Sequence, residues 1–170
     1  MTLLAPAFDE PAGWRPLATH PVGAVIAQFV GRSYVAGEPE GDRLRVRYFW
    51  RAADARPPAL AARAWFGPRA EGPPGHAHGG AMASVLDEAM GLAVWLAHRP
   101  AVAAHLETDF RKPIPLGSTV TAETTVGPAE GSGKASATAR LVGDDGTVYA
   151  EGSALFVLIA PRHGFTGGGA

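Results

Sequence analysis

One long apolar segment, residues 81–98, constrains the fold more than any other part of the sequence. It consists of good helix formers, contains no internal proline and ends before Pro100, which predicts an α-helix. Between residues 81 and 97 the polar side chains are Ser84, Asp87 and Glu88. A helix without a solvated face is normally buried on every side. We therefore expect other elements to enclose this helix, with a second copy of the chain helping to cover it.

The sequence on both sides of this helix favours β-strands. Apolar and polar residues alternate over 44–50, a pattern typical of a half-buried strand, and turn residues separate the later segments. In the first strand after the helix, alternation predicts one face with Val102, Ala104, Leu106, Thr108 and Phe110 and an opposite face with His105. The predicted strands are 22–30, 44–50, 60–66, 102–111, 118–126, 134–142 and 147–159.

One helix covering an antiparallel sheet is an α+β layer arrangement. The 170 residues are enough for one domain with a core and too few for two. We predict an N-terminal arm at 1–20, a single domain at 21–160 and a flexible tail at 161–170. The net charge of −1 argues against nucleic-acid or membrane partners. The absence of cysteine and of a signal-peptide pattern predicts a cytoplasmic protein.

The segment 78–91, HGGAMASVLDEAMG, carries the residues that point to chemistry. A carboxylate in the third turn of an apolar helix, Asp87, is costly to bury unless it is paired or used. Carboxylates with perturbed pKa values gather at functional sites. The alternative is that Asp87 or Glu88 reaches solvent at a helix edge. We interpret Glu88 as a residue at the edge of the site, with the acid role passing to it only if the helix is rotated.

Gly79 and Gly80 stand at the expected start of the same helix. Free N–H groups and the helix dipole make such an end electropositive, and glycine lets a ligand approach closely. It could stabilise an oxyanion, or it could be an ordinary glycine-rich loop. Gly79 and Asp87 are eight residues apart, which is about 12 Å along a helix. If both groups act on one carbonyl, they must come from different protomers.

The sequence resembles the hotdog-fold thioesterase superfamily over roughly residues 72–159, about half of the chain. Three segments carry the resemblance, GPPGHAHGGAMASVLDEAMG, HLETDFRKPIPLGSTVTAET and DGTVYAEGSALFVL. The 4-hydroxybenzoyl-CoA thioesterase and phenylacetate-pathway branches and the mammalian thioesterase-superfamily proteins are similar. The resemblance implies a central helix wrapped by five or six strands, and dimers that pair sheets edge to edge and often form tetramers.

The resemblance also implies roles for particular residues. Asp87 falls on the family's catalytic acid, a general base or a nucleophile, Gly79 on the residue whose N–H polarises the thioester carbonyl, and His78 on the histidine of the HGG motif. Two positions depart from the family: Gly72 replaces an Asn of some relatives, and Ala103 replaces a Ser or Thr that positions water. His105, expected on the same strand face as Ala103, could compensate, or Thr108 if the register shifts by one.

We therefore predict hydrolysis of an acyl-CoA thioester to a free acid and CoA, with no cofactor beyond the CoA of the substrate. Two rivals are a non-catalytic acyl-CoA binding module and a hotdog dehydratase or hydratase. His76 and His78 form an HxH pair that could bind a metal, but no Cys and no nearby acid joins them, so we predict no metal site. The remaining predicted substrate-binding residues are Gly80, the acyl-chain contacts Met82, Leu86 and Met90, and the pair Arg111 and Lys112, which could meet a CoA phosphate or be solvated.

Overall fold

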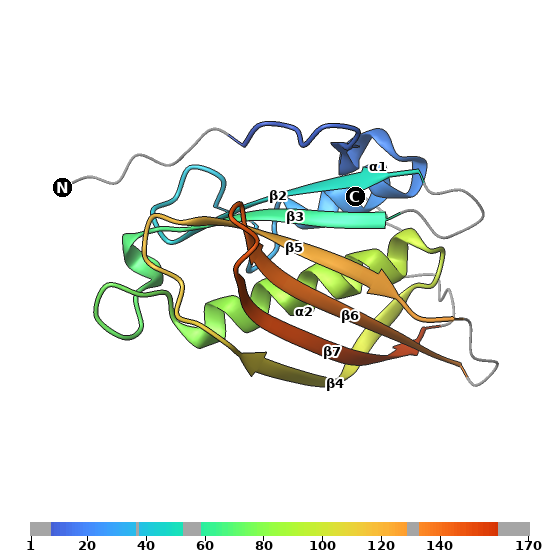
Figure 1. The fold of residues 1–170 in the computed structure, drawn as a ribbon. Coiled ribbons are helices and arrows are strands. Elements are labelled where there is room, and N and C mark those ends of the chain that lie inside the picture. The colour runs from blue at the N-terminus through green and yellow to red at the C-terminus, as the bar shows by residue number, and fades with distance from the viewer. Residues whose placement is uncertain (1–7, 37, 53–58, 129–132, 160–170) are drawn as a thin grey trace.

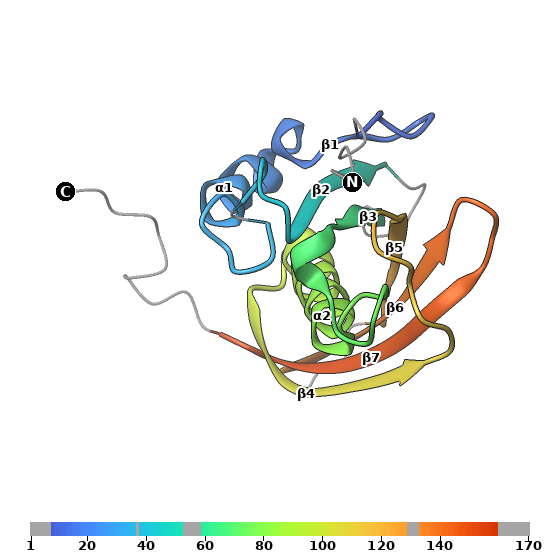
Figure 2. The ribbon, with the colours of Figure 1, turned by 90° about the vertical axis from the view of Figure 1, so that its left-hand side faces the viewer.

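A seven-stranded antiparallel sheet curls around one long helix in the computed structural model, which describes residues 8–36, 38–52, 59–128 and 133–159 (Figure 1). Figure 2 looks nearly along this helix and shows the sheet curving around it. The strands run in the order β1-β2-β3-β5-β6-β7-β4. The elements are β1 (Arg15–Pro16), η1 (Leu17–Thr19), α1 (Pro21–Val30), β2 (Leu44–Arg51), β3 (Ala59–Phe66), η2 (Pro68–Ala70), α2 (Gly79–Leu96), β4 (Ala101–Phe110), β5 (Thr119–Val126), β6 (Lys134–Gly143) and β7 (Val148–Leu158).

This architecture confirms the predicted α+β hotdog fold. The sheet has one strand more than the five or six expected because the two-residue β1 pairs with β2. Arg15 and Pro16 of the predicted N-terminal arm thus join the sheet, and Leu17 is buried in the core. The predicted tail at 161–170 lies outside the described residues.

Helix α2 forms the centre of the core. The side of the helix that faces the sheet buries its apolar side chains, as expected for a helix with few polar residues. The helix begins two residues earlier than predicted, because the side chain of His78 caps it and both glycines join its first turn. The chain then leaves the helix through His98, whose positive φ of 59° ends the helical path. The buried residues of α2 are Met82, Val85, Leu86, Ala89, Met90, Ala93, Val94 and Leu96.

The prediction of a strand at 22–30 is wrong, because this segment is the helix α1. Pro21 stands in the first turn, where its missing N–H costs nothing, and His20 Nδ1 accepts a hydrogen bond from Val22 N at 3.2 Å. A short apolar run has no periodicity that separates a strand from a helix, and these two cap signals are what distinguish the helix here. Helix α1 contacts α2 near the end of the sheet that carries β2 (Figure 2).

The predicted faces of β4 are also corrected. A β-bulge lies between Ala103 and His105, which pair with the consecutive residues Phe156 and Leu155 of β7. Because consecutive residues of β7 point to opposite faces, Ala103 and His105 do as well. The inserted residue Ala104 thus prevents His105 from taking the place of the water-positioning residue. Past the bulge, Leu106, Thr108 and Phe110 lie on the face that Ala103 shares, toward α2.

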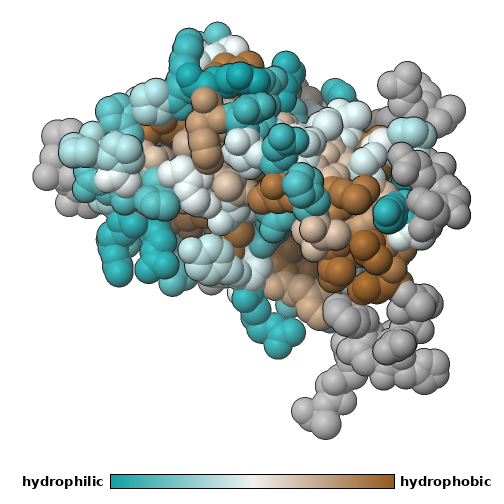
Figure 3. Space-filling view, turned by 90° about the horizontal axis from the view of Figure 1, so that it is seen from below, coloured by the Kyte–Doolittle hydropathy of each residue, from teal (hydrophilic) through white to brown (hydrophobic). Residues whose placement is uncertain are grey.

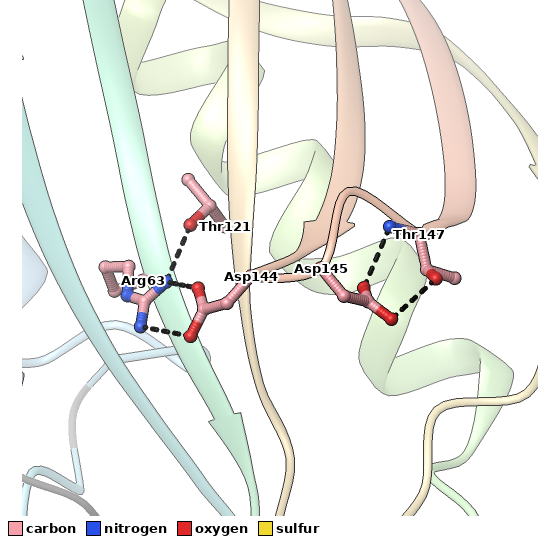
Figure 4. Close-up of polar contacts among 5 residues, drawn as sticks. All are labelled: Arg63, Thr121, Asp144, Asp145 and Thr147. Carbon is pink, nitrogen blue, oxygen red and sulfur yellow. Dashed lines mark hydrogen bonds and ion pairs between the residues drawn. The ribbon is translucent and has the colours of Figure 1, made fainter.

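A polar cluster holds the β6–β7 turn against the outer face of the sheet (Figure 4). The guanidinium of Arg63 on β3 donates to Thr121 at 3.0 Å and forms an ion pair with Asp144. Asp145 closes the turn by accepting from the backbone N–H and the hydroxyl of Thr147 at 2.9 and 3.0 Å. These interactions lower the pKa of both aspartates. The cluster therefore stabilises the sheet and stands apart from the helix.

Within the described ranges, no helix combines the length and the apolar character that crossing a membrane requires.

Candidate active site

The N-terminus of α2 is capped by His78. Its Nδ1 accepts a hydrogen bond from Gly80 N at 2.9 Å, and its carbonyl accepts from Ala81 N at 2.9 Å. The side chain thus does the work of the usual Ser, Thr, Asp or Asn cap. Capping is a role that the sequence analysis did not assign to His78, and it fixes the imidazole at the entrance to the helix.

Gly79 is the first residue of α2, and its N–H has no hydrogen-bond partner in the part of the chain that the structure describes. A Cβ at this position would lie 3.3 Å from Cζ of Phe110, a tight contact. Glycine therefore keeps the space between the helix start and the end of β4 open. The predicted role of this N–H toward a thioester carbonyl stays a prediction.

Asp87 lies half-buried in the third turn of α2 and makes no hydrogen bond or ion pair with the described residues. Burial raises the pKa of its carboxyl. The carboxylate lines a pocket of about 370 Å³ whose other walls are mainly apolar. A carboxylate that burial perturbs and no donor occupies is free to accept a proton or to attack a carbonyl carbon.

The neighbouring carboxylate of Glu88 is held by two hydroxyl groups. Tyr48 on β2 and Ser33 in the loop after α1 both donate to Glu88 Oε1, the second at 3.0 Å. Burial raises the pKa of Glu88, and the two hydrogen bonds oppose that rise. The pKa of buried Tyr48 is raised well above its ordinary value by burial and by the charge of Glu88. Two adjacent carboxylates thus differ in task, because Glu88 joins elements while Asp87 remains unpaired.

The continuous helix between Gly79 and Asp87 keeps the two groups apart in one chain. Their eight-residue separation corresponds to about 12 Å of helix, whereas catalytic contacts to a carbonyl are about 3 Å. The two neighbours of Gly79 also border a different pocket from Asp87. His78 and Gly80 border a second pocket of about 390 Å³ that includes Arg43 and Arg69, whereas Asp87 borders the first.

Sequence analysis missed most of the pocket at Asp87. Because 22–30 was interpreted as a strand, the side chains of α1 could not be placed beside the long helix. The other available signal was the four-residue spacing of Asp87, Gly91 and Trp95, which puts them on one side of α2. The pocket is lined by Ile26, Phe29, Asp87, Glu88, Gly91, Leu92, Trp95, Ala101, Ala103 and Phe156.

The predicted acyl-chain contacts Met82, Leu86 and Met90 do not line this pocket. All three are buried on the side of α2 that faces the sheet, and a Cβ on Gly152 of β7 would touch both Leu86 and Met90. Their positions give them a core role. Of the predicted strand residues, Ala103 does share the pocket with Asp87.

The two departures from the family have structural consequences. Gly72 packs against the cap of α2, and a Cβ there would lie 2.7 Å from Cα of His78. An Asn could not occupy this position without a shift of the backbone. Ala103 brings no hydroxyl to the pocket, and Thr108 is the hydroxyl residue on the same face of β4.

The pair Arg111 and Lys112 follows β4 on the surface. Both backbone N–H groups donate to Tyr149 O, at 2.8 and 3.1 Å. The Arg111 guanidinium already meets Glu151 at 2.9 Å and Asp109 at 3.4 Å. These acids weaken Arg111 as a phosphate ligand, and the predicted CoA contact of the pair stays a prediction. Over the described residues, no three His, Cys, Asp or Glu side chains gather as metal ligands would.

The single helix within a curled antiparallel sheet, together with a carboxylate in its third turn, defines the class of hotdog-fold proteins with a helix-borne acid. Sequence comparison points to a family. Residues 74–141 match the thioesterase superfamily.

Three relatives illustrate the likeness. The acyl-coenzyme A thioesterase THEM4 of Xenopus laevis is 34% identical over 95 residues, which are 56% of this chain and 43% of that protein. Thioesterase superfamily member 2 of zebra fish is 18% identical with a TM-score of 0.61, over 79% of this chain and 94% of that one. A thioesterase protein of Streptococcus pneumoniae, solved with coenzyme A, is 16% identical with a TM-score of 0.59, over 68% and 90%. The chain spans less than half the length of the THEM4 protein it matches.

Proposed function

We propose that this chain hydrolyses an acyl-CoA thioester to a free acid and CoA. The observation that carries the proposal is the half-buried, unpaired carboxylate of Asp87 at an apolar pocket. The relationship to acyl-coenzyme A thioesterases supports the same reaction, as does the coenzyme A bound to a protein of the same fold.

The proposed chemistry needs Asp87 in its ionised form. As a general base, Asp87 takes a proton from water while the water oxygen bonds to the thioester carbon. As a nucleophile, a carboxylate oxygen attacks that carbon, and water then cleaves the mixed anhydride. In both routes the C–S bond breaks, the acyl group leaves as a carboxylate, and the sulfur leaves as the thiol of CoA. The polarised helix start stabilises the charge that develops on the carbonyl oxygen.

The proposed site is completed by a second protomer, because Gly79 and Asp87 of one chain lie too far apart. Two observations support a homodimer. β4 is a terminal strand of the sheet, with backbone groups on one side unpaired by any described strand. Apolar side chains are also exposed along this end of the sheet, where brown surface gathers in the view from below (Figure 3). They are Val102, Leu106, Phe110 and Val157.

The direct test is release of thiol from a panel of acyl-CoA thioesters by the wild-type chain and by Asp87→Asn. We expect kcat to fall about 100-fold or more in the variant, the range expected when a general base is lost. Circular dichroism should show an unchanged fold, because Asn has nearly the same shape. Full activity of Asp87→Asn would refute the proposed role of the carboxylate.

The same panel separates the rival functions. The missing family hydroxyl at Ala103 and the missing amide at Gly72 favour a binding module as the second candidate. A binding module would bind acyl-CoA tightly, as measured by calorimetry, and would release no thiol. A dehydratase or hydratase would add or remove water while the thioester stays intact, which mass spectrometry of the product detects.

A further inference from the structure

The pocket at Asp87 runs along the C-terminal half of α2. Asp87, Gly91 and Trp95 line it and recur every four residues, so they lie on one side of the helix. Each step of four residues advances about 6 Å along the axis, so the backbone positions of Asp87 and Trp95 are about 12 Å apart along the helix. The indole is oriented, since Trp95 Nε1 donates to Ala101 O at 2.8 Å. Along this side of the helix, the pocket therefore has a carboxylate at one end, Gly91 without a side chain in the middle and an indole at the other end.

The walls between these ends are apolar. Ile26 and Phe29 of α1 stand on one side, and Ala103 of β4 and Phe156 of β7 on the other. The ionisable side chains of the lining are Asp87 and Glu88, at the same end. A ligand carboxylate inside the pocket would lose its hydration, find no cation in the lining and meet the like charge of these acids.

We propose that the acyl group of the substrate lies between α1 and the C-terminal half of α2, with Gly91 setting the longest group that fits. This inference rests on the proposed function and narrows its substrate class to uncharged, apolar aliphatic or aryl-acyl thioesters. The thioester carbonyl lies at Asp87, and the far end of the acyl group points toward Trp95. Dicarboxylic acyl groups are excluded.

Gly91 is the point at which the pocket can be altered without disturbing the fold. A Cβ added there would lie 3.7 Å from Cε1 of Phe156, an ordinary contact. Alanine also favours a helix more than glycine does. Gly91→Ala should therefore fold at least as well as the wild type while narrowing the middle of the pocket.

The neighbouring Leu92 offers the opposite change. Its side chain is partly buried and lines the same pocket. Leu92→Ala should widen the cavity. Gly31→Ala is the matched control, because Gly31 ends α1 outside this pocket and an added Cβ would lie 3.9 Å from Ala27 O.

The experiment measures kcat/KM for straight-chain acyl-CoA thioesters of increasing length, a phenylacyl thioester and a dicarboxylic one. For the longest group that the wild type accepts, Gly91→Ala should lower kcat/KM by about tenfold or more, the effect of one misfitting methylene. The loss should become smaller as the acyl group shortens. Leu92→Ala should extend the range to longer groups, and Gly31→Ala should leave the profile unchanged.

Different outcomes overturn the two proposals. If the wild type hydrolyses thioesters but Gly91→Ala keeps the wild-type length profile, or a dicarboxylic substrate is preferred, the pocket assignment is wrong and the proposed function stands. If the wild type releases no thiol from any substrate, the proposed function fails. Calorimetry with uncharged primary alcohols of increasing chain length then tests the pocket alone. Binding that weakens with chain length in Gly91→Ala supports the pocket, and equal binding in both chains overturns it.

Discussion

At the scale of single residues, the contrast between Asp87 and Glu88 is the central feature of the site. The two carboxylates are neighbours in sequence, yet Glu88 accepts two hydroxyl hydrogen bonds and Asp87 accepts none from the described residues. Burial raises the pKa of both. Hydrogen bonds stabilise the ionised form of Glu88 in a structural role. The carboxylate of Asp87 has no such donors and can accept a proton during the reaction.

The raised pKa of Asp87 predicts the pH dependence of hydrolysis. Because the reaction needs the carboxylate, kcat/KM should fall as pH decreases through the folded-state pKa of Asp87. That acidic limb should lie above the ordinary Asp pKa of about 3.9. A pH profile of kcat/KM on one good substrate measures it. A limb at or below the ordinary value would contradict the burial argument.

The same pKa shift predicts the stability of Asp87→Asn. A carboxyl whose pKa is raised on folding binds more protons in the folded than in the unfolded state, so its contribution to stability falls as pH rises between the two pKa values. Above the folded-state pKa the ionised Asp87 is therefore a net cost. Urea unfolding at neutral pH should show Asp87→Asn at least as stable as the wild type, with the advantage disappearing in acid.

Removing the hydroxyl of Tyr48 should weaken the fold through Glu88. In Tyr48→Phe the buried carboxylate loses one of two donors, which we expect to cost about 1–3 kcal/mol of unfolding free energy. The pKa of Glu88 should rise further, so the loss should be larger at neutral pH than in acid, where Glu88 is protonated. Urea unfolding at both pH values measures the difference. A loss independent of pH would show that packing rather than the hydrogen bond is responsible.

At the scale of elements, the termini of α2 and the irregular β4 decide how the site is built. His78 starts the helix and places two glycines in its first turn. The bulge at Ala104 gives Ala103 to the pocket and turns His105 to the outer face. Helix α1 supplies one wall of the pocket through Ile26 and Phe29.

The cap at His78 predicts a separation of stability from catalysis. His78→Ala should lower the unfolding free energy by about 1 kcal/mol through loss of the cap, and His78→Asn should restore it because Asn is a strong cap residue. If the imidazole also contacts substrate, kcat/KM should stay low in both variants. Urea unfolding and thiol release on the same samples give the two readouts. Unchanged stability of His78→Ala would contradict the capping role.

At the scale of the whole molecule, the proposed homodimer rests on the terminal strand β4 and on the distance between Gly79 and Asp87. An antiparallel pairing of β4 with its own copy would extend the sheet and cover exposed apolar side chains. The same pairing would bring the helix start of one protomer toward the carboxylate of the other.

Leu106 lies in the middle of β4 and is 37% exposed. Leu106→Glu would bring two like charges together in a self-paired strand, which is unfavourable. We expect sedimentation to show a dimer for the wild type and a monomer for the variant, with loss of hydrolysis. Val25→Glu is the control, because Val25 is 51% exposed on α1, away from β4. A fully active monomer would refute a shared site.

Much of this architecture could be predicted from the residues in order. The alternating strands from 44 onward, the long apolar helix, the carboxylate within it and the helical distance from Gly79 to Asp87 all follow from local patterns. These patterns depend only on residues that are close together in the sequence, so the sequence by itself determines these features.

Helix α1 is also decided locally, because Pro21 and the side chain of His20 start a helix in an apolar run whose periodicity does not separate it from a strand. Tertiary structure decided the rest. One inserted residue, Ala104, exchanged the faces of β4, and packing against β2 and the loop after α1 gave Glu88 its two donors while leaving Asp87 unpaired. The pocket joins α1, α2, β4 and β7. Its lining depends on which distant segments meet, and no local pattern carries that information.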